Sequence, residues 1–483
     1  WQENVVFDFI KQSYLLTSRW THDLVSETEG LDPKTKKKVD FYTRQFVDAM
    51  APTNFLMTNP EVLRTTLESR GDNLVHGLQD LLEDMERGKG KLSIRMTDPD
   101  AFEVGGNIAT APGKVVYQND LMQLIQYAPT TEEVATRPML IVPPWINKFY
   151  ILDLQEESSL IRWLVDQGRT VFVISWVNPG PELAHKTFAD YMHEGIFGAL
   201  DAIRQATGER DVDAIGYCIG GTLLGCTLAW MAAKGDDRIK STTFFTAQMD
   251  FEEAGELLLF IDDEQIANLE RQIDAAGGIM EASAMSKTFN MLRPVDLIWS
   301  VYIDNYLKGK APKQFDLLFW NSDSTSMSRE VYLFYLREFY QNNRLSAGEL
   351  ELDGVRLDLG KVTIPIFMQA GEKDHIAPAR SIYRSARLYG GPVQFMLAGS
   401  GHIAGVVNHP DRKKYHYSVN TDLPETIEQW MEGAVRHDFS WWPYWIKWLD
   451  EISPGTVPAR NPGDGELTPL EEAPGSYVKV RFA

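Results

Sequence analysis

The sequence predicts an α/β fold with a mostly parallel central sheet, and three observations predict it. Strand-like and helix-like segments alternate from about residue 106 to residue 245. Within them, an apolar run at 212–216 leads directly into Gly216-x-Cys218-x-Gly220, which a glycine- and alanine-rich helical stretch follows. Two later apolar runs are followed by Asp374 and His402. Together these features place candidate reactive side chains at the ends of strands.

The chain begins with a region that we expect to be helical. Residues 5–17, 33–50 and 60–87 mix apolar and charged positions at a spacing near 3.6. Asn59 before Pro60 is typical of a helix cap followed by a proline in the first turn. Its apolar content predicts that this N-terminal region, residues 1–105, packs on the core.

The Gly-x-Cys-x-Gly spacing at 216–220 is that of a nucleophile elbow. A strand must turn sharply into a helix with the nucleophile at the apex, so only small residues fit beside it. This predicts an α/β-hydrolase fold whose first core half spans 106–247, with Cys218 in the place where serine is usual. A buried structural cysteine is the alternative at Cys218, and it is our interpretation of Cys226, further along the same helix.

This fold requires an acid and then a histidine after the nucleophile, each following a late strand. Asp374 follows the strand-like run 364–370, and His402 follows the run 393–397, within a second core half at 360–452. His402 would take the proton of Cys218, and Asp374 would orient the imidazole and stabilise its cation. An isolated aspartate or histidine in a loop is more often a turn former, but here the order of all three agrees.

Two backbone N–H groups are also needed for the oxyanion of an acyl-transfer reaction. Ile219 supplies one, directly after the nucleophile. The strand-like run 139–142 enters Pro143-Pro144-Trp145-Ile146, where the prolines have no N–H, so Ile146 is the second candidate and Trp145 the fallback. The alternative interpretation is a connection merely stiffened by proline.

Between the two core halves, residues 248–359 turn helical, aromatic and methionine-rich, which favours a cap or lid subdomain. A lid excludes water from a reactive acyl intermediate. The aromatic run 440–445 is predicted to be a helix that packs on the core or serves a partner. Residues 453–483 are predicted to form an extended C-terminal tail.

Many separate blocks of this chain, in one order, resemble the polyhydroxyalkanoate synthases, in particular class I, the single-subunit enzymes that prefer short-chain monomers. The blocks are residues 9–16, 51–55, 142–150, 174–179, 216–222, 319–323, 374–376 and 401–405. The resemblance implies that Cys218 carries the acyl chain, that His402 activates it, and that Asp374 activates the 3-hydroxyl of the incoming monomer. Whether Asp374 orients the imidazole, deprotonates the monomer or does both is left open by the residues themselves.

The resemblance also implies the reaction. Cys218 would attack an (R)-3-hydroxyacyl-CoA, such as 3-hydroxybutyryl-CoA, and release CoA while a polyester grows. No resident cofactor or metal is expected, because CoA enters with the substrate and leaves as product. Trp145, His375 and Ala404 are candidate pocket residues. A homodimer in the cytoplasm, bound to the surface of polyester granules, is the expected state. Because full-length members carry a helical region ahead of the part that begins here at Trp1, we expect a fragment.

Composition limits the possible partners. A formal charge of −21 argues against nucleic acid, which requires a basic face. There is no uninterrupted apolar run of about 18 residues, so no transmembrane segment is expected. Two cysteines, one of them a candidate thiolate, favour a reducing compartment.

Two other function classes are compatible with parts of this pattern. A thioesterase or depolymerase would use the same three side chains but deliver the acyl group to water. A catalytically silent granule protein would carry a Cys218 no more reactive than an ordinary thiol, and the presence of Asp374 and His402 argues against it.

Overall fold

The computed structural model describes residues 1–90, 92–282, 284 and 290–481, which fall into two compact units. The helical unit comprises residues 1–102 and 285–322. The sheet unit comprises residues 103–284 and 323–483. The segment predicted as one cap, 248–359, is therefore shared between the units, with its middle part in the helical one.

The helical unit contains the helices predicted at the start of the chain. Three of them begin after a residue whose side chain accepts the first free N–H groups, namely Asn4, Asp32 and Asn59. The predicted helix 60–87 is interrupted at Gly71, where φ is 92°, a conformation that favours glycine. Among the described residues of this unit, the α-helices are α1 (Val5–Ser26), α2 (Pro33–Ala49), α3 (Pro60–Glu68), α4 (Asp72–Arg87), α11 (Ser300–Tyr302) and α12 (Asp316–Ser322).

Close packing on α4 explains why part of the predicted cap belongs to the helical unit. A Cβ atom on Gly77 would lie 2.0 Å from the carbonyl oxygen of Tyr306, so only glycine permits this approach. The Tyr306 hydroxyl donates to Asp84 at 2.5 Å, and Asn73 donates to the carbonyl of Leu307 at 2.7 Å. These contacts join α4 to a segment more than 200 residues away.

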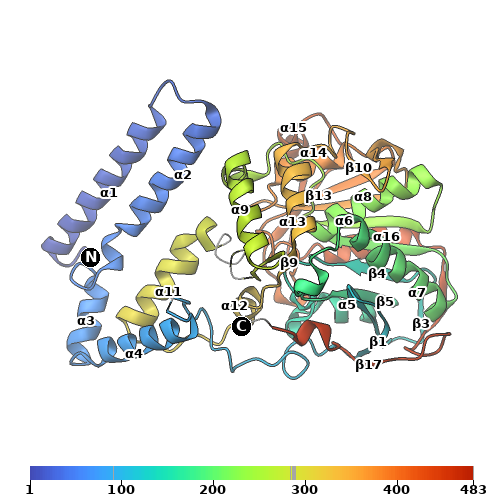
Figure 1. Ribbon diagram of the computed structural model, residues 1–483, viewed down its shortest axis with the longest axis horizontal. Helices are drawn as coiled ribbons and strands as arrows, with labels where there is room; N and C mark the ends of the chain where they lie inside the picture. Colours follow the sequence, from blue (N-terminus) through green and yellow to red (C-terminus); the bar gives the residue numbers. More distant parts are fainter. Residues whose placement is uncertain (91, 283, 285–289, 482–483) are drawn as a thin grey trace. The chain divides into compact units, whose positions relative to one another are not determined.

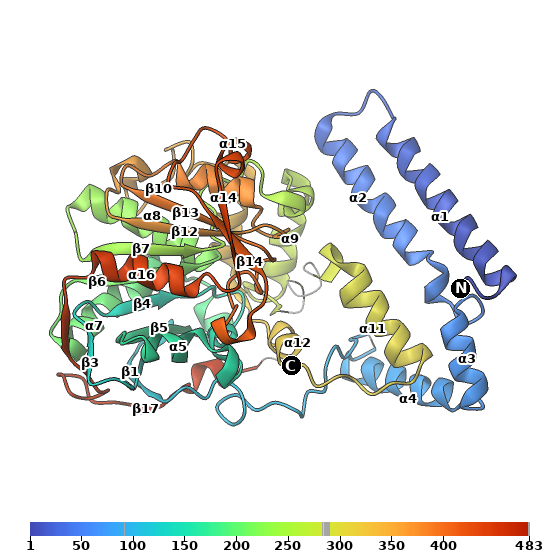
Figure 2. The same ribbon diagram turned by 180° about the vertical axis from the view of Figure 1, so that it is seen from behind.

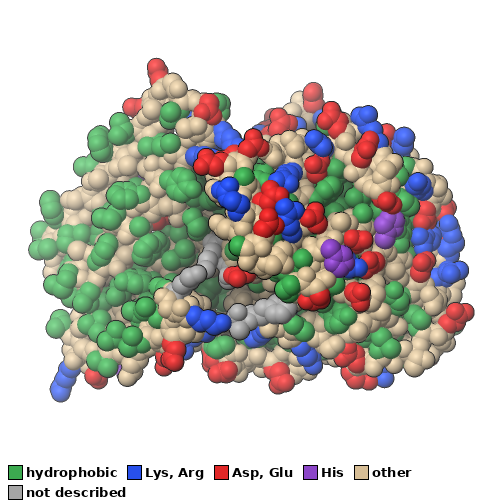
Figure 3. Space-filling view, in the orientation of Figure 1, with side chains coloured by type: hydrophobic (Ala, Val, Ile, Leu, Met, Phe, Trp, Pro, Cys, Tyr) green, Lys and Arg blue, Asp and Glu red, His purple; other side chains and the backbone are tan. Residues whose placement is uncertain are grey.

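Apolar side chains remain exposed on the helical unit. On α1, Val5, Phe9 and Trp20 are among them, and Figure 3 shows hydrophobic side chains gathered over this unit. Despite this apolar content, no helix within the described ranges is both long and apolar enough to cross a membrane. That the N-terminal region packs on the core stays a prediction.

The sheet unit is built on an eleven-stranded sheet, counted over the described residues, in the order β15-β14-β13-β12-β7-β6-β4-β5-β2-β1-β17. The central strands, from β5 to β13, run parallel, and those outside them are antiparallel. The strands are β1 (Gly113–Gln118), β2 (Met122–Tyr127), β4 (Met139–Val142), β5 (Val171–Trp176), β6 (Val212–Tyr217), β7 (Ile239–Phe245), β12 (Ile366–Gly371), β13 (Val393–Ala398), β14 (His416–Val419), β15 (Val435–Asp438) and β17 (Glu471–Glu472).

Helices lie over both faces of this sheet (Figures 1 and 2), which confirms the predicted α/β architecture. Successive residues of β7 show the two faces, because the Phe244 ring stacks on Tyr389 while the Phe245 ring contacts Trp441 and Trp445. The flanking helices are α5 (Leu160–Asp166), α6 (Phe188–Asp190), α7 (Gly198–Thr207), α8 (Ile219–Lys234), α14 (Ala379–Ala386), α15 (Ile427–Glu432) and α16 (Trp442–Ile452).

The parts of the predicted cap that belong to the sheet unit lie between β7 and β12 in the chain. They contain α9 (Asp263–Ala275), α13 (Arg329–Phe334), the small sheet of β8 (Ile279–Met280) with β9 (Met327–Ser328), and the hairpin of β10 (Glu351–Leu352) with β11 (Val355–Arg356). Directly after α13 the chain continues as π-helical turns at Tyr335–Gln341. This last segment returns the chain toward β12.

The C-terminal segment, predicted as an extended tail at 453–483, pairs with strands of the sheet unit. Its strand β16 (Thr456–Pro458) runs antiparallel to β3 (Glu133–Ala135), and β17 closes the edge of the main sheet beside β1. Further on, Val478 is buried, and the carbonyl of Val480 accepts a hydrogen bond from Lys148 at 3.0 Å. The tail is therefore part of the folded sheet unit.

Candidate active site

Cys218 occupies the turn between β6 and α8 with φ 53° and ψ −128°. A positive φ is unusual for a residue with a side chain and is expected at the apex of a nucleophile elbow. A Cβ atom on Gly220 would lie 2.4 Å from the carbonyl oxygens of Val142 and Pro143, and one on Gly216 would lie 2.5 Å from the Cα of Gly221. Small residues are therefore required on both sides of the cysteine.

Asp374 and His402 meet beyond the carboxyl ends of β12 and β13. The Asp374 Oδ2 atom lies 2.7 Å from His402 Nδ1. Its Oδ1 atom accepts the N–H groups of Ile376 and Ala377, each at 2.9 Å. The Asp374 side chain is fully buried and that of His402 is nearly so. This leaves Nε2 as the ring nitrogen of His402 that is available to Cys218.

The electrostatics of the site favour a proton on His402. Burial by itself lowers the pKa of the imidazole, but the charges of Asp374 and Cys218, together with hydrogen bonds to both, outweigh it and raise that pKa from 6.5 to about 10. The structure thus brings together the three side chains that the sequence singled out, with the ring between the carboxylate and the thiol.

The two predicted oxyanion donors lie in segments that touch each other. Ile219 is the first residue of α8, where N–H groups have no partner inside the helix. The close approach of Gly220 to Val142 and Pro143 holds the loop that contains Ile146 against the start of this helix. Within the described ranges, neither the Ile219 nor the Ile146 N–H donates a hydrogen bond to the chain.

Trp145, the fallback donor and a candidate pocket residue, has its side chain in the core. Its ring contacts those of Trp176, Phe188 and Tyr191, and the residue is 1% exposed. Its carbonyl accepts a hydrogen bond from the hydroxyl of Thr325. The side chain therefore packs in the core and supports the loop that contains Ile146.

The other candidate pocket residues, His375 and Ala404, are partly exposed and lie beside the catalytic candidates in the chain. The carbonyl oxygen of His375 lies 3.0 Å from the place where a Cβ on Gly255 would be, so the acid loop packs on the start of the inserted segment. Ala404 belongs to the turn that carries His402.

Several residues around the site were not singled out from the sequence. The Tyr217 ring stacks on His402 with centroids 5.8 Å apart. Tyr335 and Tyr340, from the π-helical segment, interact electrostatically with Cys218, and burial chiefly raises the pKa of both phenols. Tyr217, next to the cysteine in the chain, was within reach of sequence reasoning; the other two are over 100 residues away and carry no motif.

The turn that carries His402 is held by hydrogen bonds from the start of α16. The indole N–H of Trp441 donates to the carbonyl of Gly405 at 2.8 Å, and that of Trp442 donates to the carbonyl of Val406 at 2.9 Å. Of the two roles considered for the aromatic run 440–445, these contacts are those of packing on the core.

The elbow, the cysteine at its apex and the Asp–His pair beyond later strands define an α/β-hydrolase-fold protein with a thiol at the nucleophile position. The family description "alpha/beta hydrolase fold" matches residues 137–408 and agrees with this class. A second description, "Poly-beta-hydroxybutyrate polymerase (PhaC) N-terminus", matches residues 1–164. The chain belongs to the poly(3-hydroxyalkanoate) polymerase family, as its relatives show.

Three of these relatives match the whole chain. It is 54% identical over 482 residues to the poly(3-hydroxyalkanoate) polymerase of Methylorubrum extorquens, of which it covers 80%. It is 53% identical over 481 residues to the poly(3-hydroxyalkanoate) polymerase subunit PhaC of Rhizobium meliloti, of which it covers 78%. It is 41% identical over 487 residues to the corresponding subunit of Cupriavidus necator, of which it covers 82%.

Proposed function

We propose that this protein polymerises (R)-3-hydroxyacyl-CoA, with 3-hydroxybutyryl-CoA as the preferred monomer, into polyester through an acyl-cysteine intermediate. The observation that carries the proposal is a thiol at the elbow of a polymerase-family chain, beside an imidazole with a raised pKa that Asp374 holds at 2.7 Å. We include in it class I membership, a homodimer, and attachment to polyester granules in the cytoplasm.

In the first half of the reaction, His402 Nε2 takes the proton of the Cys218 thiol, and Sγ attacks the thioester carbonyl of the substrate. The oxyanion that forms is stabilised by the N–H groups of Ile219 and Ile146. The carbon–sulfur bond to CoA then breaks, and His402 gives a proton to the departing thiolate. The products are free CoA and an acyl group on Cys218.

In the second half, a hydroxyl takes the place of water as the acceptor. The 3-hydroxyl of a second monomer, or of the chain end, attacks the acyl-cysteine, and His402 takes the hydroxyl proton. An ester bond forms and the thiol is regenerated. Both oxygens of Asp374 already accept hydrogen bonds. We therefore propose that Asp374 orients His402 and does not itself abstract the hydroxyl proton. No resident metal or cofactor takes part.

The test is to incubate the protein with (R)-3-hydroxybutyryl-CoA, measure free CoA and determine the mass of the acyl product by mass spectrometry. Cys218→Ala should abolish CoA release, because the thiol is the acyl carrier. Cys226→Ala is the matched control, since Cys226 is a buried thiol further along the same helix and should leave turnover intact.

Three outcomes separate the function classes. Cys218-dependent CoA release with oligoester supports the polymerase. Cys218-dependent release with only free 3-hydroxybutyrate would make the protein a thioesterase. Equal CoA release by the wild type and Cys218→Ala would rule out an acyl-cysteine intermediate for the polymerase and the thioesterase alike.

A further inference from the structure

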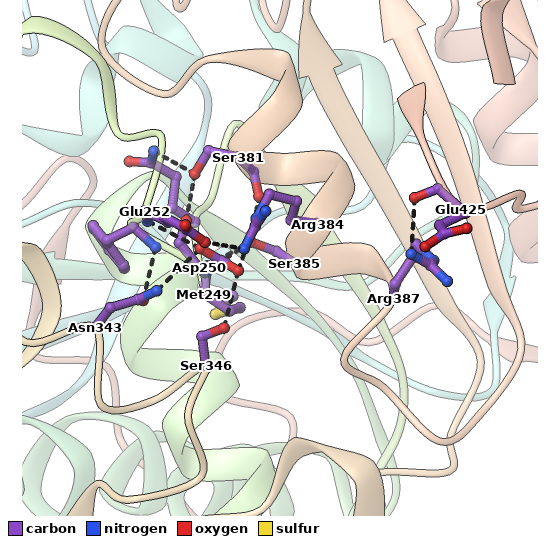
Figure 4. A network of polar contacts seen from close by, with 12 residues as sticks. Met249, Asp250, Glu252, Asn343, Ser346, Ser381, Arg384, Ser385, Arg387 and Glu425 are labelled. Carbon is purple, nitrogen blue, oxygen red and sulfur yellow. Dashed lines mark hydrogen bonds and ion pairs between the residues drawn. The ribbon is translucent and has the colours of Figure 1, made fainter. Parts of the chain in front are cut away.

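Asp250 is a buried carboxylate in the loop after β7, outside the candidate active site. Its side chain is 4% exposed, yet both of its oxygens have partners (Figure 4). Oδ1 accepts from Asn343 Nδ2 at 3.1 Å and from the N–H of Glu252 at 2.9 Å. Oδ2 accepts from the Ser346 hydroxyl at 2.9 Å and from Arg384 Nε at 3.0 Å. A buried carboxylate is tolerated only when its acceptors are used in this way.

The main chain around Asp250 is held by two serines of α14, as Figure 4 also shows. The Ser385 hydroxyl accepts the N–H groups of Met249 at 2.8 Å and of Asp250 at 3.0 Å. The Ser381 hydroxyl donates to the carbonyl of Asp250 and accepts from Gln248 Nε2 at 2.8 Å. Because α14 directly follows the turn that carries Asp374, these hydrogen bonds also connect that turn to the loop that contains Asp250.

The same loop packs on α8, the helix that begins after Cys218. The Thr222 hydroxyl donates to the carbonyl of Gln248 at 2.8 Å. A Cβ on Gly221 would lie 2.4 Å from the Cβ of Ala247, and one on Gly225 would lie 2.6 Å from the sulfur of Met249. The loop therefore fills the space between the nucleophile helix and α14.

The third segment tied to Asp250 is the π-helical return of the inserted region. Asn343, just past its end, adopts φ 46°, and its Oδ1 atom accepts the N–H of Phe251 at 2.8 Å. The Phe251 ring in turn contacts Tyr335 and Tyr340, with centroid distances of 5.9 Å and 4.9 Å. Asp250 thus fixes the end of this segment through Asn343, and Phe251 packs on its Tyr335 and Tyr340 rings.

The two tyrosines complete the path to the thiol. The two rings contact each other with centroids 5.4 Å apart, and both phenols interact electrostatically with Cys218. Thr222 lies in the first turn of the helix that Cys218 begins. A shift of the return segment would therefore change what surrounds Cys218.

We propose that Asp250 is a positioning residue that holds the Tyr335–Tyr340 pair beside Cys218 and thereby keeps water from the acyl-cysteine. This rests on the proposed function, in which hydroxyl attack must outcompete water. An ionised carboxylate only accepts hydrogen bonds, so it selects the one arrangement in which Asn343, Ser346 and Arg384 all donate to it. Asp250 would therefore affect how the acyl group is divided between water and the hydroxyl acceptor, and it would take no part in making or breaking bonds.

Asp250→Asn tests this, because it keeps the size of the side chain and replaces one acceptor by a donor. We expect the ratio of free 3-hydroxybutyrate to oligoester per CoA released to rise about tenfold, equivalent to ~1.4 kcal/mol. Alkylation of Cys218 by iodoacetamide, without substrate, should also be faster in the variant. Asp213→Asn is the matched control: Asp213 is equally buried and paired with Arg137 at 3.0 Å, but it lies near the amino end of β6, away from Cys218.

Asn343→Gly is the second variant, since glycine adopts the positive φ of this position and only the side-chain hydrogen bonds are lost. It should reproduce the effect of Asp250→Asn and decides the matter if that variant does not fold. Product ratios and alkylation rates equal to those of Asp213→Asn would overturn the proposal. If the wild type makes no oligoester, the proposed function fails, while the alkylation rates still test the positioning role.

Discussion

The charge on His402 depends on two neighbours that pull in the same direction. Burial opposes a charged imidazole, but Asp374 at 2.7 Å and the adjacent Cys218 raise its pKa to about 10. Folding therefore favours the protonated form of His402. In an unfolded chain these neighbours are lost and the pKa returns to 6.5.

This difference predicts a pH-dependent contribution to stability. A group whose pKa is higher in the folded state contributes fully below its unfolded pKa and loses that contribution as pH rises through its folded pKa. The unfolding free energy of the wild type minus that of His402→Gln should therefore be constant below pH 6.5 and decline up to about pH 10. Urea unfolding at a series of pH values measures it, and a difference that rises with pH would contradict the assignment.

At the scale of elements, α16 supports the loop that carries His402. The indoles of Trp441 and Trp442 bind carbonyls of that loop, whereas the indole of Trp445 binds the Thr243 hydroxyl in β7 at 2.9 Å. All three rings are fully buried. One helix therefore makes the same kind of bond to the loop that carries His402 and to the sheet, which permits a matched comparison.

Trp442→Phe should lower kcat more than Trp445→Phe does, although both remove one buried indole hydrogen bond. Each substitution should cost about 1 kcal/mol of stability, but only the first releases the carbonyl of Val406 in the His402 loop. Turnover and denaturant midpoints of the two variants give the comparison. Equal losses of turnover would mean that α16 acts only through stability.

At the scale of the whole molecule, Asp323 joins three distant parts of the sheet unit. Its carboxylate lies 2.7 Å from Lys148 Nζ, accepts the Tyr150 hydroxyl at 2.8 Å, and lies 3.2 Å from Arg481 Nε. Burial lowers the pKa of Lys148, and the charge of Asp323 opposes that change. The segment around Lys148 and Tyr150, the chain at Asp323 and the C-terminal tail are therefore joined by one charge cluster, in which Lys148 and Asp323 are buried and Arg481 is partly exposed.

Asp323→Asn should destabilise the sheet unit by about 3–5 kcal/mol, because it leaves the buried Lys148 charge without its counterion. The control is Asp237→Asn, which removes an exposed partner of Arg210 and should leave the free energy of unfolding nearly unchanged. Guanidinium unfolding of both variants measures the difference. Costs of similar size would show that burial of the pair adds nothing.

Local patterns were enough to predict the α/β core, because each carries its own physical signal. Apolar runs bounded by turn residues mark β4, β5, β6, β12 and β13, and the glycines around Cys218 follow from the steric demand of a sharp turn. The order of Cys218, Asp374 and His402 at strand ends could likewise be predicted without any long-range contact. The sequence alone therefore determined the fold class and the three residues of the candidate site.

Only the tertiary structure decided what the apolar surfaces pack against. An apolar helix pattern shows that a face is buried but not which partner buries it. For that reason the sequence could not assign residues 285–322 to the helical unit, bring Tyr335 and Tyr340 to Cys218, or join α16 to the His402 loop. These depend on contacts between residues far apart in the chain, which no local spacing encodes.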